Sequence, residues 1–122
     1  MLVNVVMLAF QPKVQIYPLD VTLSGEEQQQ FCKYLLNPES DDAIAHTILN
    51  RVFSAGNRDN RPHGKLFCSV SAGDVVLLGS ERWLCARSGW KKLTVKQMHD
   101  YCEMDRRDRQ FCDLLNPRNS EL

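Results

Sequence analysis

The hydrophobic residues in the middle of the chain are spaced as β-strands require. Val75–Leu78 is an apolar run of the kind found in strands buried on both faces. Gly79–Ser80 marks a turn, because glycine adopts positive φ angles at no steric cost. Arg82–Arg87 alternates as a second strand does. The pattern predicts an antiparallel hairpin at the centre of residues 66–90, closed by a loop of about three residues.

The N-terminal segment 3–23 also has strand character. Residues 3–10 are largely apolar, and residues 13–23 follow Gln11–Pro12 as a second extended segment. The alternation of the second segment changes phase near Pro18, which lacks the N–H that a central strand needs. We therefore predict two strands, the second with a bulge or at a sheet edge.

Two helices are predicted within residues 25–55. A capping box, S-x-x-E, begins at Ser24, and Asn37–Pro38 ends the helix that follows. Ser40–Asp42 begins the second helix, and Gly56 is a natural end for it. The positions with helical spacing that should be buried are Phe31, Tyr34, Leu35, Ile44, Ala45, Ile48, Leu49, Val52 and Phe53.

The C-terminal segment 95–115 should be helical as well, since Thr94 begins another capping box, T-x-x-Q. Residues 105–109, D-R-R-D-R, are polar all round, which indicates a solvated stretch or a break between two helices. Beyond Asn116–Pro117 the chain is expected to fray. The positions expected to be apolar contacts are Met98, Tyr101, Cys102, Phe111, Leu114 and Leu115.

These elements predict one α+β domain over residues 1–122, with a small antiparallel sheet centred on the hairpin and about three helices packed on it. A chain of 122 residues can bury one core. Its 43% hydrophobic and 25% charged residues are ordinary values for a soluble globular protein.

The sequence favours a cytoplasmic protein without membrane contact, metal or cofactor. The run Val5–Phe10 is far too short to cross a bilayer, and no positively charged segment precedes it. The five cysteines are odd in number and form no C-x-x-C, so reduced thiols are expected. His99 and Cys102 could share a helical face, but zinc needs about four ligands and no second pair is suitably spaced.

A pattern around the hairpin resembles a known family. The residues S-V-S-A-G-D-V-V from Ser69 and R-W-L-C-A-R-S-G-W from Arg82 are similar to YodL-like domains, small domains of bacterial, plasmid and phage proteins. The segment 53–62 also resembles the stretch before that core, so the similarity covers about residues 43–93. Ala72 stands where the family pattern has valine. The resemblance implies a fold and a mobile-element context, but no activity.

No motif indicates catalysis. The chain has no phosphate-binding loop, no G-x-S-x-G and no H-E-x-x-H. Asp74 is interpreted as a turn former, because its carboxylate can accept nearby backbone N–H groups. Cys68 or Cys85 could pair with His63 or His99 only if the fold joined them. We therefore predict no enzymatic activity and no catalytic residue.

Charge suggests where a partner binds. The net charge is zero, but residues 51–96 hold nine bases and three acids, 9 − 3 = +6, and the rest of the chain carries −6. We predict a non-enzymatic binding module, a mobile-element or phage-related regulator or a host-factor inhibitor, acting by protein–protein contact. The alternative is nucleic-acid binding, with Trp83 and Trp90 stacking on bases among the basic residues. Whether the acidic ends neutralise the basic centre stays open, as does the oligomeric state. The candidate partner-binding residues are Arg58, Arg61, Lys65, Arg82, Arg87, Trp90, Lys91 and Lys92.

Overall fold

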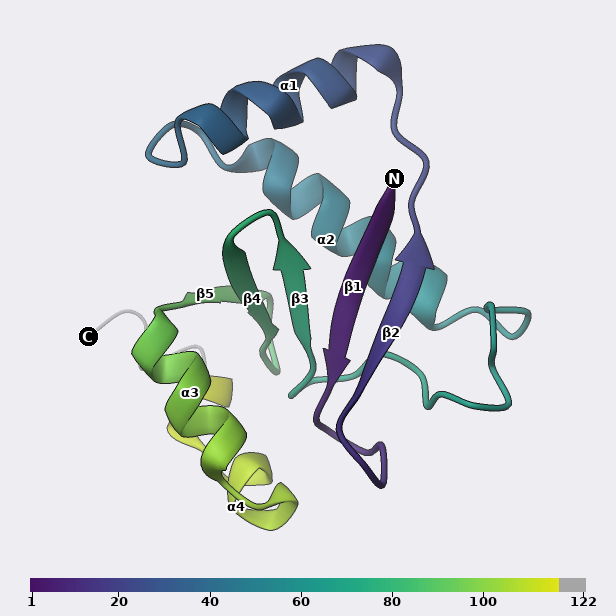
Figure 1. Cartoon of the computed structure of the whole chain (residues 1–122), viewed down its shortest axis with the longest axis vertical. Coiled ribbons are helices and arrows are strands. Elements are labelled where there is room, and N and C mark those ends of the chain that lie inside the picture. Colours follow the sequence, from purple (N-terminus) through teal and green to yellow (C-terminus); the bar gives the residue numbers. More distant parts are fainter. Residues whose placement is uncertain (117–122) are drawn as a thin grey trace.

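The computed structural model describes residues 1–116 and has an α+β fold, as predicted (Figure 1). Five antiparallel strands form one sheet in the order β2-β1-β3-β4-β5. The predicted tail beyond Asn116 lies outside the described residues. The elements are β1 (Leu2–Met7), β2 (Gln15–Asp20), α1 (Gly25–Leu36), α2 (Ala43–Gly56), β3 (Val75–Leu78), β4 (Glu81–Cys85), β5 (Trp90–Leu93), α3 (Val95–Glu103), α4 (Arg106–Gln110) and the short 3₁₀ helix η1 (Asp113–Leu115).

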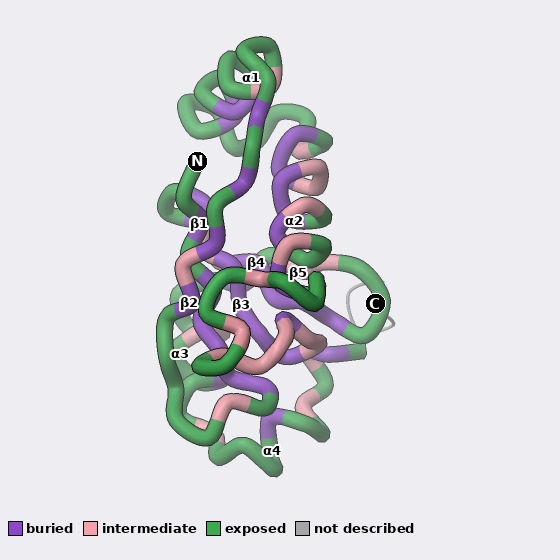
Figure 2. Tube along the Cα trace, turned by 90° about the vertical axis from the view of Figure 1, so that its right-hand side faces the viewer, coloured by how far each residue is buried: buried purple, intermediate pink, exposed green. Residues whose placement is uncertain are grey.

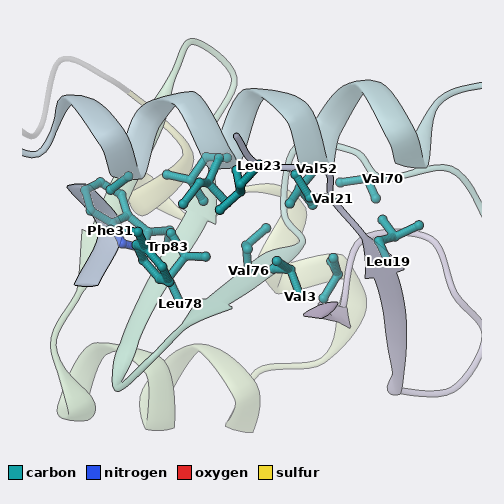
Figure 3. Packing of buried hydrophobic residues seen from close by; sticks show 14 of the residues in the cluster. Val3, Leu19, Val21, Leu23, Phe31, Val52, Val70, Val76, Leu78 and Trp83 are labelled. Carbon is teal, nitrogen blue, oxygen red and sulfur yellow. The ribbon is translucent and has the colours of Figure 1, made fainter. Parts of the chain in front are cut away.

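The larger core lies between the sheet and α2. Because strand side chains alternate, Val5, Val76 and Trp83 all point to this face, where they pack in one cluster with Ile48 and Val52 of α2. Figure 3 shows several of these side chains between the helix and the strands. In Figure 2, α2 is buried on the side facing the strands, whereas α1 is mostly exposed.

The opposite face of the sheet carries a smaller core under the C-terminal helices. Val6, Val75 and Leu84 pack here against Tyr101 of α3 and Leu115 of η1. α3 and α4 cover only part of this face, and Leu2 and Ile16 of the β1–β2 pair therefore stay exposed. The sheet is therefore enclosed on one face and half-open on the other.

The hairpin and the edge strand differ slightly from expectation. Leu78 pairs with Glu81, so the loop between β3 and β4 has two residues, and the predicted three-residue loop is wrong. Gly79 adopts φ +57° in that turn. β2 is an edge strand, as one of the two alternatives for Pro18 predicted, and its pairing with β1 is continuous without a bulge. Pro18 and Asn4 form a non-hydrogen-bonded pair, so the backbone nitrogen of Pro18 points away from β1. The N–H that proline lacks is therefore not needed for a hydrogen bond between the two strands.

Four positions expected to be buried are exposed: Leu35, Phe53, Cys102 and Phe111. α2 buries a stripe that ends at Gly56, where Val70 of the following loop packs so closely that a Cβ on this glycine would lie 2.3 Å from the valine side chain. Phe53 lies outside this stripe and remains half-exposed. The other three stay exposed because α1, α3 and α4 each contact the core along one narrow side.

The C-terminal segment breaks into two helices, which is one of the two alternatives predicted for residues 105–109. Met104 is extended, and the Asp105 side chain caps α4 by accepting the Asp108 N–H. The expectation of a stretch that is polar and solvated all round is wrong for Arg109. Its side chain is 8% exposed and lies over the ring of Tyr101.

Asp74 connects the hairpin to the end of β1. Its carboxylate accepts the backbone N–H of Ser71, as a turn former does, and also those of Leu8 and Ala9, at 2.8–2.9 Å. Burial raises the pKa of Asp74, and the three amide donors lower it, with burial the stronger effect. The preceding Gly73 adopts φ +106°, and its carbonyl accepts the Tyr101 hydroxyl at 2.7 Å. This junction holds β1, β3 and α3 in fixed positions around the pocket described below.

Candidate functional site

The predicted partner-binding residues fall into two separate groups. Arg58, Arg61 and Lys65 lie in the loop after α2, which packs beside β2 because Phe67 stacks on Tyr17 with 4.3 Å between ring centroids. The other five lie on or next to β4 and β5, and β5 is the opposite edge of the sheet from β2. The structure therefore does not join the eight residues into one basic patch.

Several of these basic side chains brace the fold. Arg61 donates to the carbonyls of Gly64 and Phe67, which closes the loop on itself. Arg82 donates to the carbonyls of Ser80 and Leu93. By contrast, Arg58 and Lys65 are exposed and Lys91 is half-buried, and none of the three side chains has a hydrogen bond or ion pair within residues 1–116.

The exposed Lys92 pairs with a buried carboxylate, Glu81, which also bonds two buried aromatic side chains. The Glu81 carboxylate accepts from the Tyr34 hydroxyl at 2.6 Å and from Trp83 Nε1 at 3.1 Å, and Lys92 Nζ lies 2.9 Å away. Burial pushes the pKa of Glu81 up, but the hydrogen bonds from Tyr34, Lys92 and Trp83 leave it lowered overall. Burial, with the Glu81 carboxylate beside it, raises the pKa of Tyr34 to about 12.

The two tryptophans are consequently tied into the fold. Trp83 is 3% exposed, and the Lys92 ammonium lies 5.3 Å from its ring centroid. Trp90 is half-buried and donates from Nε1 to Asn50 of α2. The Trp83 ring is therefore part of the core and offers no face for a base to stack on.

A pocket of about 380 Å³ lies where α4, the β1–β2 connection and the 71–74 turn meet. Its apolar wall comes from small or aliphatic residues, Leu8, Ala9, Ala72, Gly73 and Leu115, together with the ring of Tyr101. Two phenylalanines complete the lining. Phe10 is 54% exposed and Phe111 is 74% exposed, so both lie at the outer side of the pocket. We call this site the arginine pocket, for the residues described next.

Three arginines line the arginine pocket: Arg87 from the β4–β5 connection, and Arg106 and Arg109 from α4. Each guanidinium donates only to backbone carbonyls. Arg87 reaches Gln110 O at 2.7 Å, and Arg106 reaches Phe10 O at 3.4 Å. Arg109 donates to Leu8 O and Met104 O. Within residues 1–116, no carboxylate forms an ion pair with any of the three.

The acidic residues near α4 face elsewhere. No aspartate or glutamate lines the arginine pocket. Asp100, Asp108 and Asp113 instead line a neighbouring groove, shared with Lys91, beside α3 and α4. The lining of the pocket thus holds three arginines and no carboxylate, although Tyr101 and Phe111 line both surfaces. The Asp74 carboxylate lies behind the pocket wall, bonded to the N–H groups of Leu8 and Ala9.

The structure does not join the cysteines and histidines that the sequence singled out, over residues 1–116. Burial, with the Asp74 charge nearby, raises the pKa of the Cys85 thiol to about 11, the opposite of what a nucleophilic thiolate needs. Over residues 1–116 no hydrogen bond joins a cysteine to a histidine, and no three metal-ligating side chains gather. His99 is exposed and lies near the carboxylates of Asp100 and Glu103.

Of the eight predicted site residues, Arg87 alone lines the arginine pocket. Arg106, Arg109, Phe10 and Phe111 were missed. The signal that could have found the arginines is their i, i+3 spacing, which places both on one face of α4.

No protein-family model, no curated protein and no solved structure matches this chain. The resemblance to YodL-like domains accordingly stays a prediction that depends on the residues quoted above. Among the described residues, no helix is long and apolar enough to cross a membrane.

Proposed function

We propose that this protein is a non-enzymatic binding module that recognises a protein partner through the arginine pocket. One observation carries the proposal: three guanidinium groups without an acidic partner in residues 1–116 surround an apolar pocket that contains no acidic residue. A buried charge is usually paired, and Arg109 is buried with only carbonyl partners. Arg87 and Arg106 are exposed beside it, so the three together favour recognition of an anionic surface.

The positions of the other basic residues favour a protein over a nucleic acid. A single strand is held by a continuous basic groove with aromatic rings exposed for stacking. Here the basic residues lie at two edges of the sheet, and Trp83 is buried. Exposed aromatic residues beside arginines, such as Phe10 and Phe111, occur in protein interfaces and in single-strand sites alike, so the separation of the basic residues carries the preference for a protein.

The resemblance to YodL-like domains extends this proposal to a biological setting. It favours a cytoplasmic regulator encoded by a phage or plasmid, or an inhibitor of a host factor. The extension is an analogy, since a fold does not fix a function.

Site-specific photo-crosslinking in the native cells tests the proposal. A photoreactive amino acid replaces Phe111 in one variant and Leu36 in a matched control. Leu36 is 88% exposed at the end of α1, far from α4 (Figure 1). We expect one recurrent protein adduct from position 111 that is absent from position 36 and is lost when Arg106→Ala is added. Adducts to nucleic acid alone, or equal adducts from both positions, would contradict the proposal.

Oligonucleotide titrations test the alternative directly. Fluorescence anisotropy with single- and double-stranded probes should show weak binding without preference near physiological salt. Micromolar or tighter binding, with a log–log salt slope near −0.7 to −0.9 per phosphate contacted, would establish nucleic-acid binding instead. Arg58→Ala then serves as the diagnostic variant, because its side chain has no structural bond in residues 1–116 to lose.

A further inference from the structure

We infer that the arginine pocket binds a short partner segment in which one large apolar side chain is flanked by carboxylates. The inference rests on the proposed function and names the chemistry of the partner. The apolar side chain would occupy the pocket, and the carboxylates would pair with the arginines around it.

The apolar wall sets the size of the anchoring side chain. A volume of about 380 Å³ is near the lower end of ligand pockets. Three of its wall residues, Ala9, Ala72 and Gly73, carry little or no side chain. A Cβ on Gly73 would lie 3.2 Å from both the Ala9 side chain and the Tyr101 hydroxyl. A phenylalanine or leucine side chain therefore suits the pocket better than a compact ion.

The three arginines determine which charges should flank the anchoring side chain of the partner. Arg109 is largely buried with only carbonyl oxygens as partners, and an approaching carboxylate would supply the opposite charge. Arg106 is held near the first turn of α4 by Phe10 O, and Arg87 near its last turn by Gln110 O. Arg106 is the first residue of α4 and the Arg87 guanidinium contacts its last residue, Gln110, so the two positive groups approach the pocket from opposite ends of this helix. Carboxylates on both sides of the anchor would thus each meet an arginine.

The exposed phenylalanines favour a peptide segment over a small carboxylic acid. Phe10 and Phe111 extend the apolar surface beyond the pocket itself. A small ligand would leave most of both rings in water, whereas the residues next to an anchor in a peptide would cover them. Aromatic side chains of this kind often carry a large share of interface affinity.

The test uses labelled five-residue peptides and the full chain. The first probe has a central phenylalanine with two glutamates on each side, so that either alternation phase offers carboxylates. The second replaces the four glutamates with glutamine, and the third replaces phenylalanine with alanine. We expect the first probe to bind in fluorescence anisotropy, more weakly as salt rises, and the other two to bind at least about tenfold more weakly.

Variants locate the binding. Arg106→Gln and Arg87→Gln should each weaken the first probe about tenfold, because each removes one charge-assisted pair. Ala72→Leu enlarges one residue of the apolar wall and keeps all three arginines, so it should abolish the advantage of phenylalanine over alanine. Arg58→Gln removes the same charge from the far loop and should change nothing. Circular dichroism and melting curves confirm that each variant is folded.

Equal binding of glutamate and glutamine probes, no binding of the first probe at low salt, or equal losses in Arg58→Gln and Arg106→Gln would overturn the inference. These failures are separable from failure of the proposed function. A specific protein adduct from position 111 with no binding of the acidic peptide keeps the protein-binding role and rejects only this partner chemistry.

Discussion

Replacing Asp74 should reveal how much one buried carboxylate stabilises the junction of β1 and β3. The side chain is 1% exposed and accepts three backbone N–H groups, from Leu8, Ala9 and Ser71. Asp74→Ala leaves all three donors without an acceptor. Asp74→Asn keeps a carbonyl oxygen for Leu8 and Ala9 but turns an amide donor towards the Ser71 N–H.

The expected magnitudes follow from these bonds. A hydrogen bond to a charged group contributes about 1.5–3 kcal/mol, so three are worth roughly 4–9 kcal/mol before the burial of charge is subtracted. That subtraction is substantial, because burial raises the pKa of Asp74 despite its three donors. We therefore expect Asp74→Ala to cost about 3–5 kcal/mol of the free energy of unfolding. Asp74→Asn should cost about 1–2 kcal/mol, since one bond is lost and the charge is removed.

Urea denaturation followed by circular dichroism and tryptophan fluorescence measures both values. Asp59→Ala is the matched control, because Asp59 is exposed with no partner in residues 1–116, and a change within about 0.5 kcal/mol is expected. A loss below about 1 kcal/mol in Asp74→Ala would refute the reasoning from unsatisfied donors. Equal losses in the alanine and asparagine variants would show that the charge matters and the acceptor geometry does not.

Two further predictions concern pairs outside the pocket. The hydrogen bond from Arg51, with that from the Ser24 backbone, holds the pKa of Glu27 at about 2, below its ordinary 4.5. This stabilisation is present above pH 4.5 and is lost as the pH falls towards 2. Glu27→Gln should therefore reduce the fall of the melting temperature between pH 4.5 and 2. An unchanged fall in the variant would contradict the pairing. Arg61→Ala should cost about 1–2 kcal/mol by freeing the carbonyls that it bonds, whereas Arg58→Ala should be neutral; chemical denaturation compares the two, and equal values would show that Arg61 does not brace the loop.

The elements that the sequence predicted well depend on interactions over a few residues. Both capping boxes form, with Ser24 and Thr94 bonded to the N–H three residues on and the reverse bond also made. The apolar run Val75–Leu78 is a buried strand in the centre of the sheet. Such features can be predicted from the sequence because the residues that cause them are neighbours in the chain.

Contacts between distant segments could not be predicted from the sequence. The bond from Ser71 to Asp74 follows from local turn chemistry, but those from Leu8 and Ala9 join residues more than 60 positions away. Arg109 is another case. A charged residue in a short polar helix is normally solvated, and only the tertiary fold places it over Tyr101.

The candidate site shows the same limit. Counting charge along the chain drew attention to residues 51–96, whereas the arginine pocket takes Arg106 and Arg109 from beyond that segment. Much of the positive charge of residues 51–96 is paired within the fold, as in the Lys92–Glu81 pair. Linear charge density cannot distinguish a cation that bonds a carbonyl or carboxylate of its own fold from one that faces a partner.

The position of β1 between β2 and β3 has a consequence for the order of folding. β1 and β2 form one local hairpin, and β3, β4 and β5 form a local meander, but β1 must also pair with β3 across two helices and a long loop. Closing a long loop costs more entropy than closing a turn, and non-local pairings slow folding. We expect the hairpin and the meander to form early and their union to limit the rate. During synthesis on the ribosome, β1 keeps one open edge until residues 75–78 have left the exit tunnel, so the nascent chain is most exposed to mispairing over that interval.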